Sequence, residues 1–227
     1  MTPAPRLEAV RSSIAEAARR AGRDPREVTL VAVSKTQPAD VVLGVIEAGV
    51  TDLGENRAQE FREKVTLLGG KARWHFIGPL QTNKVRQVVG ACALIHSVDR
   101  PGLAEAIARR ASATDSVQDV LIEVNVAGDP NKHGVEAARA VALARAIEAL
   151  EGVRVRGLMT MPPYPEEPEQ SRPFYRGLAA LSEQLVEELP EAKELSMGMS
   201  RDFEVAIEEG ATIVRIGTAI FGPRRSR

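Results

Sequence analysis

The sequence predicts an α/β fold in which eight parallel strands close into a (β/α)8 barrel, preceded by one extra helix at the N-terminus. Eight short runs rich in β-branched residues alternate with stretches of helical periodicity, which indicates consecutive βαβ units. The chain has 227 residues, a length that suits eight such units. The alternative is an open doubly wound sheet. We favour the barrel because the strand count matches and no glycine-rich turn follows the first run.

The N-terminal stretch, residues 5–22, predicts an amphipathic helix that ends near Gly22. It carries Glu8 and Glu16 and has no continuous apolar segment, and both features argue against a targeting peptide. Its apolar residues recur at helical spacing on one face: Leu7, Val10, Ile14, Ala17 and Ala21. We therefore expect this helix to pack on the barrel.

The eight predicted strands follow in order along the rest of the chain. They occupy 29–35, 51–56, 73–79, 94–99, 120–126, 153–161, 194–200 and 212–222. The clearest helical pattern between them covers 134–150. A proline-rich stretch, 161–174, is interpreted as a loop between a strand and the next helix, so residues 1–227 are expected to form one domain. The basic tail, 223–227, is expected to be solvated.

Composition excludes several classes of function. The chain has 30 basic and 31 acidic residues and a formal net charge of -1, which argues against nucleic acid or an acidic membrane as the main partner. No apolar run approaches the roughly 20 residues that span a bilayer. A single cysteine, Cys92, fits a reducing cytoplasm. Three histidines and one cysteine predict no transition-metal site.

Lys35 ends the apolar run "LVAVSK" and is the first candidate site residue. Barrels handle their ligands at the C-terminal ends of the strands, so Lys35 lies where a ligand is expected. A lysine desolvated at a barrel mouth has its ammonium form disfavoured. The neutral amine is the nucleophile that forms a Schiff base with a carbonyl compound.

The last two strands supply a complementary phosphate site. The run "RIGTAIFG" places Arg215, Gly217 and Thr218 near a strand end, where backbone N–H groups can bind phosphate oxygens. Ser200 follows the seventh strand at the position of a helix N-cap, and helix N-termini attract anions. A Schiff-base lysine opposite a phosphate site indicates a ligand that is both an aldehyde and a phosphate ester.

Each of these residues also has a purely structural interpretation. Lys35 can cover apolar surface with its stem, and Arg215 can form an ion pair between a strand and a helix. His75 and His96 can be hydrogen-bonded core residues, and Ser200 can simply cap a helix. The joint pattern is harder to explain in this way than any one residue.

Four segments resemble the pyridoxal phosphate homeostasis proteins, also called proline synthetase co-transcribed homologues. They are "VSKTQP" (33–38), "GENRAQE" (54–60), "WHFIGPLQTNK" (74–84) and "SMGMSRDFEVAIEEGATIVRIGTAIFG" (196–222). The resemblance implies the barrel fold of the alanine racemase N-terminal domain, with pyridoxal 5'-phosphate carried on Lys35. It also implies that Arg215 faces the pyridine nitrogen and that Asn56 lies beside the ring. Ser200, Gly217 and Thr218 would hold the phosphate, and His75 belongs to the cofactor-binding set.

The resemblance implies a protein that binds pyridoxal phosphate and buffers or delivers it to apoenzymes, acting as a cytoplasmic monomer. Two alternatives stay open: an amino-acid racemase-like enzyme and a cofactor-free Schiff-base aldolase. The racemases use a second domain with a catalytic tyrosine, which we do not expect here. An arginine at the pyridine nitrogen donates a hydrogen bond but gives no formal proton, so the ring is a weaker electron sink. No catalytic residue is therefore assigned.

Overall fold

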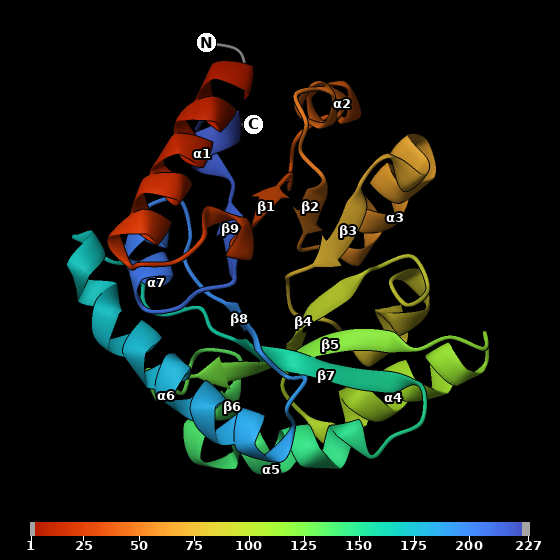
Figure 1. The fold of residues 1–227 in the computed structure, drawn as a ribbon. Coiled ribbons are helices and arrows are strands. Elements are labelled where there is room, and N and C mark those ends of the chain that lie inside the picture. Colours follow the sequence, from red (N-terminus) through yellow and green to blue (C-terminus); the bar gives the residue numbers. More distant parts are fainter. Residues whose placement is uncertain (1–2, 224–227) are drawn as a thin grey trace.

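Eight parallel strands close into a barrel surrounded by helices in the computed structural model, which describes residues 3–223 (Figure 1). Most of the predicted basic tail lies outside the described residues. The barrel strands are β1 (Thr29–Val33), β2 (Asp52–Glu55), β3 (Arg73–Phe76), β4 (Leu94–Val98), β5 (Gln118–Asn125), β7 (Val153–Met159), β8 (Glu194–Ser196) and β9 (Ile213–Ile216). Seven of the eight predicted runs contain one of these strands, and the run 120–126 overlaps β5, which begins two residues earlier, so the predicted (β/α)8 class is confirmed.

The strand order fixes how the barrel closes. Neighbouring strands follow the sequence β4-β3-β2-β1-β9-β8-β7-β5, and an additional pairing of β4 with β5 joins the two ends of the sheet. All of these pairings are parallel, so the C-terminal ends of the strands meet around one mouth. The two-residue strand β6 (Val135–Glu136) pairs with β5 outside this ring.

Helices cover the outside of the barrel (Figure 1). They are α1 (Pro3–Arg20), α2 (Ala39–Glu47), α3 (Ala58–Leu68), α4 (Pro101–Ser112), α5 (Ala137–Glu148), α6 (Arg172–Glu188), α7 (Phe203–Glu208) and α8 (Thr218–Phe221). Short 3-10 turns lie at η1 (Pro25–Glu27), η2 (Gly69–Lys71), η3 (Thr82–Gln87) and η4 (Pro168–Ser171). No helix among the described residues has the length and apolar character needed to cross a membrane.

The predicted N-terminal helix is α1, and it packs against α7, α8 and α2. Figure 1 shows it beside α8, so the first and last helices of the described chain lie side by side. Leu7, Val10, Ile14 and Ala17 are buried in the core between helices and strands, as their spacing predicted. Gly22 follows the helix with a φ of +69°, a conformation that favours glycine at a helix end.

Several boundaries differ from the prediction. The predicted strand 212–222 contains both β9 and α8, because the backbone turns at Gly217 directly into a helix. The predicted helix 134–150 begins at Ala137, because the two residues before it pair with β5. Strands β1 and β2 end before Lys35 and Asn56, so these two residues lie in the loops that rim the mouth.

The barrel interior contains an apolar cluster distinct from the main core. The cluster is formed by one residue from each of five strands: Val31, Leu94, Leu121, Met159 and Ile213. Alternate residues on these strands point to opposite faces of the sheet, so one set fills the interior and the other packs under the helices. Buried polar side chains, among them His96, Ser196 and Arg215, form part of the candidate site.

Gly78 lets two site-bearing loops lie against each other. A Cβ atom at residue 78 would lie 2.3 Å from the carbonyl oxygen of Asn56 and 2.7 Å from its Cα atom. The carbonyl oxygen of Gly78 also accepts a hydrogen bond from Ser97 Oγ at 2.5 Å. A side chain at residue 78 would therefore displace the loop that carries Asn56.

We predict that Gly78→Ala lowers the free energy of unfolding by about 1–3 kcal/mol, because the new methyl group overlaps backbone atoms. Gly177→Ala is the matched control. Residue 177 is exposed on α6, and a Cβ atom there meets nothing within 4 Å. This control should raise the free energy of unfolding by about 0.5–1 kcal/mol. Urea denaturation measures both, and equal stability of the two variants would contradict the packing argument.

Candidate functional site

Lys35 lies half-buried in a tight turn that follows β1. Gln37 N donates to the carbonyl oxygen of Ser34 at 3.0 Å across this turn. The next residue, Thr36, has a φ of +64°, which is uncommon for a β-branched residue and costs conformational energy. Thr36 N donates to Glu60 Oε2 of α3 at 2.9 Å, and this bond fixes the strained turn. The backbone around Lys35 is thus held in one conformation.

A buried ion pair holds the residue before Lys35. Lys64 Nζ, on α3, donates to the carbonyl oxygen of Ser34 at 2.6 Å and to Glu55 Oε1 at 2.5 Å. Ser34 Oγ donates to the same carboxylate oxygen at 2.7 Å. Burial raises the pKa of Glu55, and Lys64 and Ser34 oppose that rise. Among the described residues, Glu55 Oε2 is a buried oxygen with no hydrogen-bond partner.

Ser200, Gly217 and the start of α8 come together beside the C-terminal end of β1, because β9 pairs with both β1 and β8. Ser200 Oγ accepts hydrogen bonds from Gly217 N at 3.2 Å and from Ala219 N at 3.3 Å. Thr218 is exposed between these two donors. The expected N-cap role of Ser200 is not what the structure shows, because α7 begins at Phe203 with Asp202 in the cap position. Instead, Ser200 ties the loop after β8 to the end of β9.

Asp202 anchors the loop that carries Ser200. Its Oδ2 atom accepts hydrogen bonds from Ser171 Oγ and Tyr175 Oη, both at 2.7 Å, and its Oδ1 atom accepts from Met199 N at 2.8 Å. Asp202 and Tyr175 are both buried. Burial and the neighbouring Asp202 carboxylate raise the pKa of Tyr175, so its hydroxyl keeps its proton and donates.

Arg215 lies on β9 with its side chain in the barrel interior, 3% exposed. It donates from Nη1 to Ser196 Oγ at 2.5 Å and from Nη2 to the carbonyl oxygen of Thr160 at 2.8 Å. Burial lowers the pKa of Arg215, and the nearby Tyr175 and Glu123 oppose that effect. A guanidinium is donor-only, so it can offer hydrogen bonds to a ligand but accept none.

The two remaining predicted site residues occupy different positions. Asn56 is half-buried directly after β2, on the mouth side. His75 lies within β3, 2% exposed, and binds Asp52 Oδ1 through Nε2 at 2.9 Å and His96 Nε2 through Nδ1 at 3.0 Å. Both ring nitrogens of His75 are therefore engaged by protein side chains. Its membership in the cofactor-binding set stays a prediction.

Glu123 adds a titrating group to the interior. It lies near the C-terminal end of β5 and is 7% exposed. Burial and the nearby Asp99 carboxylate raise the pKa of Glu123 to about 7, against the opposing effect of Arg215. Near neutral pH, a large fraction of this carboxyl group is therefore uncharged.

Sequence reasoning missed the residues that fix the site rather than form it. Glu55 and Asp202 belong to the quoted segments "GENRAQE" and "SMGMSRDFEVAIEEG", but charged residues beside a strand end or a helix start normally indicate solvent contact. Nothing in the sequence around Lys64 indicates that it is buried, because its burial depends on Ser34, which follows β1, and on Glu55 of β2. Asp202 is likewise bonded to residues far away in the sequence, Ser171 on η4 and Tyr175 on α6, and only the folded structure brings them together.

Sequence comparisons place the chain among proteins of known name. The family model described as "Alanine racemase, N-terminal domain" matches residues 6–225. A pyridoxal phosphate homeostasis protein from Aquifex aeolicus is 49% identical over 227 residues, covering 99% of this chain and 100% of the relative. A protein of the same name from Escherichia coli K12 is 41% identical over 222 residues, covering 96% of this chain and 95% of the relative.

Solved structures give the same result. PipY from Synechococcus elongatus, in a structure with pyridoxal phosphate bound, superposes with a TM-score of 0.84 at 32% identity, covering 97% of this chain and 100% of PipY. The crystal structure of an unknown protein from Bifidobacterium adolescentis superposes with a TM-score of 0.93 at 36% identity, covering 97% of this chain and 94% of that protein. Alanine racemase from Corynebacterium glutamicum gives 0.70 at 15% identity, covering 97% of this chain and 62% of the racemase, which shows a shared fold alone.

The raised pKa of Glu123 predicts a pH-dependent stability. The folded state keeps the Glu123 proton up to about pH 7, whereas the unfolded chain loses it near the ordinary value of 4.5. Raising the pH through this window therefore destabilises the folded protein. The uncharged Glu123→Gln variant does not undergo this loss. Its free energy of unfolding relative to the wild type should therefore rise as the pH increases above 4.5, reaching a gain of about 3 kcal/mol at pH 8.

Urea denaturation of the cofactor-free protein at pH 5 and pH 8 measures this difference, with Glu183→Gln, exposed on α6, as the control. A Glu123→Gln variant that gains no more at pH 8 than at pH 5 would contradict the assignment.

Proposed function

The chain belongs to the alanine racemase N-terminal domain family and, within it, to the pyridoxal phosphate homeostasis proteins, and we propose that it binds pyridoxal 5'-phosphate and serves as an intracellular carrier of this cofactor. We propose further that Lys35 holds the cofactor as a Schiff base and that the protein buffers or delivers it to apoenzymes as a cytoplasmic monomer. When bound, pyridoxal phosphate supplies an aldehyde that condenses with amines and a ring that withdraws electrons.

The residues at the mouth fit this cofactor. The observation that carries the proposal is the meeting of two backbone N–H groups, from Gly217 and Ala219, on the Ser200 hydroxyl at the same mouth as Lys35. Such N–H groups already bind an oxygen atom, and phosphate oxygens are acceptors of the same kind. Ser200, Gly217 and Thr218 would hold the phosphate.

The rest of the cofactor has counterparts on neighbouring strands. Lys35, held in its fixed turn, would bind the aldehyde carbon. Arg215 would donate to the pyridine nitrogen, and Asn56 would lie beside the ring. A Cβ atom at Gly217 would lie 3.4 Å from the carbonyl oxygen of Val33, an ordinary contact, so the protein itself leaves room there. The absence of a side chain at this position is better explained by close approach of a ligand.

The site supports a carrier more than an enzyme. Arg215 is a donor, so it does not supply the formal proton that makes the ring a strong electron sink. Tyr175 is buried and donates to Asp202, so its hydroxyl is not offered to a ligand as an acid or base. Tyr164 is 74% exposed, and the Arg201 guanidinium lies 5.2 Å from its ring centroid. General acid–base assistance is typically worth about 10²–10⁴-fold in rate.

We predict that borohydride reduction of the protein loaded with pyridoxal phosphate fixes the cofactor on Lys35. Lys35→Arg keeps the positive charge but removes the amine, so it should abolish both the fixation and the Schiff-base absorbance. Lys193→Ala, an exposed lysine before β8 at the opposite end of the barrel, should leave both unchanged. Peptide mass mapping locates the modification, and labelling mainly at another lysine would overturn the assignment.

We predict that the loaded protein restores the activity of an apo pyridoxal-phosphate enzyme, while showing no substantial racemase, transaminase or decarboxylase turnover on common amino acids. Both assays use one preparation, and free pyridoxal phosphate at the same concentration is the reference. Rapid turnover of one amino acid without transfer to the apoenzyme would favour the racemase-like alternative. A protein that binds no pyridoxal phosphate, yet forms a Schiff base with another carbonyl compound, would favour the aldolase.

A further inference from the structure

A continuous series of hydrogen-bonded side chains crosses the barrel interior and ends at Arg215. It begins at Asp52 on β2 and passes through His75 on β3, His96 on β4 and Ser196 on β8. The successive distances are 2.9 Å from Asp52 Oδ1 to His75 Nε2, 3.0 Å from His75 Nδ1 to His96 Nε2, and 2.8 Å from His96 Nδ1 to Ser196 Oγ. All five side chains are buried. We call them the interior chain.

The donor at one end of the interior chain and the acceptor at the other limit the hydrogen bonds between them to two possible directions. Arg215 can only donate, and it donates to Ser196 Oγ. The pKa of Asp52 is lowered, since hydrogen bonds from His75 and Thr51 outweigh its burial, so this carboxylate is ionised and only accepts. His75 must therefore carry its hydrogen on Nε2. An uncharged His75 then accepts on Nδ1 from His96 Nε2–H.

The same logic continues to the serine. Burial, His75 and Arg215 lower the pKa of His96 well below its ordinary value, so His96 is uncharged. With its hydrogen on Nε2, His96 accepts on Nδ1 from the Ser196 hydroxyl. Ser196 thus accepts once, from Arg215, and donates once. The reverse direction would need a charged His75 and would leave the Ser196 hydrogen without a partner among the contacts shown by the described residues.

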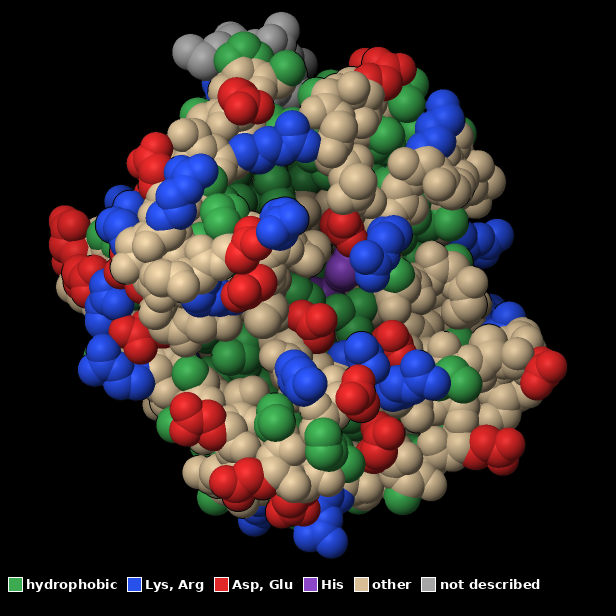
Figure 2. Space-filling model, in the orientation of Figure 1, with side chains coloured by type: hydrophobic (Ala, Val, Ile, Leu, Met, Phe, Trp, Pro, Cys, Tyr) green, Lys and Arg blue, Asp and Glu red, His purple; other side chains and the backbone are tan. Residues whose placement is uncertain are grey.

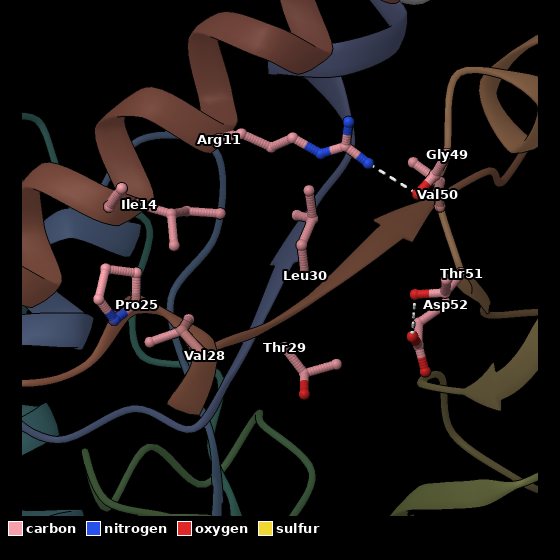
Figure 3. Close-up of a pocket in the computed structure, with 11 residues that line it drawn as sticks. Arg11, Ile14, Pro25, Val28, Thr29, Leu30, Gly49, Val50, Thr51 and Asp52 are labelled. Atoms are coloured by element: carbon pink, nitrogen blue, oxygen red, sulfur yellow. Dashed lines mark hydrogen bonds between the residues drawn. The ribbon is translucent and has the colours of Figure 1, made fainter.

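The far end of the interior chain lies away from the mouth. Asp52 is the first residue of β2, and it lines a cavity of about 350 Å³ formed by α1, the start of β1 and the loop before β2 (Figure 3). Figure 2 shows this hollow, with apolar side chains at its floor and charged ones at its edge. Thr51 Oγ1 donates to Asp52 Oδ2 at 2.7 Å, and Arg73 Nε lies 3.7 Å from Oδ1. Asp52 is thus held in place from outside the barrel.

We propose that Asp52, His75, His96 and Ser196 are positioning residues for Arg215: they hold its guanidinium as a correctly aimed hydrogen-bond donor through a series of bonds that all point from Arg215 toward Asp52. The inference deepens the proposed function, because it concerns the arginine that would face the pyridine nitrogen. A buried arginine is costly unless its donors are satisfied, and Ser196 supplies an acceptor whose own hydrogen is already directed away from it. His75 thus acts through Arg215 rather than on the cofactor.

The direction is tested on the cofactor-free protein by NMR of ¹⁵N-labelled histidine. The chain has three histidines, and exposed His133 serves as an internal reference. We expect His75 and His96 both to be uncharged, with the hydrogen on Nε2. Ser196→Ala should shift the Nδ1 resonance of His96, which loses its donor, and leave the tautomer of His75 unchanged. A hydrogen on Nδ1 of His96, or a doubly protonated His75, would overturn the proposed direction.

The positioning role is tested by cofactor binding. Ser196→Ala should weaken pyridoxal phosphate binding by about ten-fold and shift the absorbance maximum of the bound cofactor, because Arg215 loses one of its two acceptors. Asp52→Asn replaces the carboxylate by a weaker neutral acceptor, so it should act in the same direction and to a smaller extent. Ser182→Ala, a buried serine on α6, is the matched control and should change neither quantity.

The outcomes separate this inference from the proposed function. Failure of the wild type to bind pyridoxal phosphate would reject the proposed function, and the histidine spectra would still decide the direction of the interior chain. Normal binding by the wild type, with the same affinity and absorbance maximum in Ser196→Ala, would reject the positioning role alone. If Ser196→Ala does not fold, Asp52→Asn decides: an unchanged affinity and spectrum in that variant would also reject it.

Discussion

The pairing of β4 with β5 is the constraint on which the site depends, because it closes the parallel sheet into a barrel. Closure places the C-terminal ends of strands far apart in the sequence around one mouth. Lys35 after β1 and Ser200 after β8 therefore face a common space, although 164 residues separate them along the chain. An open sheet with the same strands would leave two edges and no shared interior. The site at the mouth therefore depends first on the strand order, which brings its residues together, and only then on the chemistry of each residue.

Closure also creates an interior that must be filled, and this protein fills part of it with polar groups. An arginine placed there needs acceptors for its hydrogens, and the protein provides Ser196 and a backbone carbonyl. Ser196 in turn needs an acceptor, which His96 supplies, and the series ends only where Asp52 reaches the outer end of the barrel. A buried donor at one strand end thus determines which residues can occupy four other strands.

Buried charged side chains also hold the loops at the mouth in place. The turn around Lys35 is strained at Thr36, and a buried lysine–glutamate pair together with Glu60 keeps it in place. In the loop after β8, Asp202 accepts hydrogen bonds from two hydroxyl groups and one backbone N–H, and so fixes the loop of Ser200. Rigid loops limit the conformational entropy lost on binding, which suits a protein proposed to carry a small cofactor.

The sequence by itself determined the fold class, because hydrophobic periodicity and the number of strand–helix units are local properties that survive without knowledge of contacts. It also indicated Lys35 and the Gly217 region, since strand ends are readable and barrels place ligands there. Only the tertiary structure decided that His75 is part of a hydrogen-bonded chain, that Ser200 binds backbone N–H groups at the start of α8 rather than capping α7, and that Asp202 is buried. These roles depend on partners that closure of the barrel brings together. The residues next to each of them in the sequence therefore cannot indicate which partners it will have.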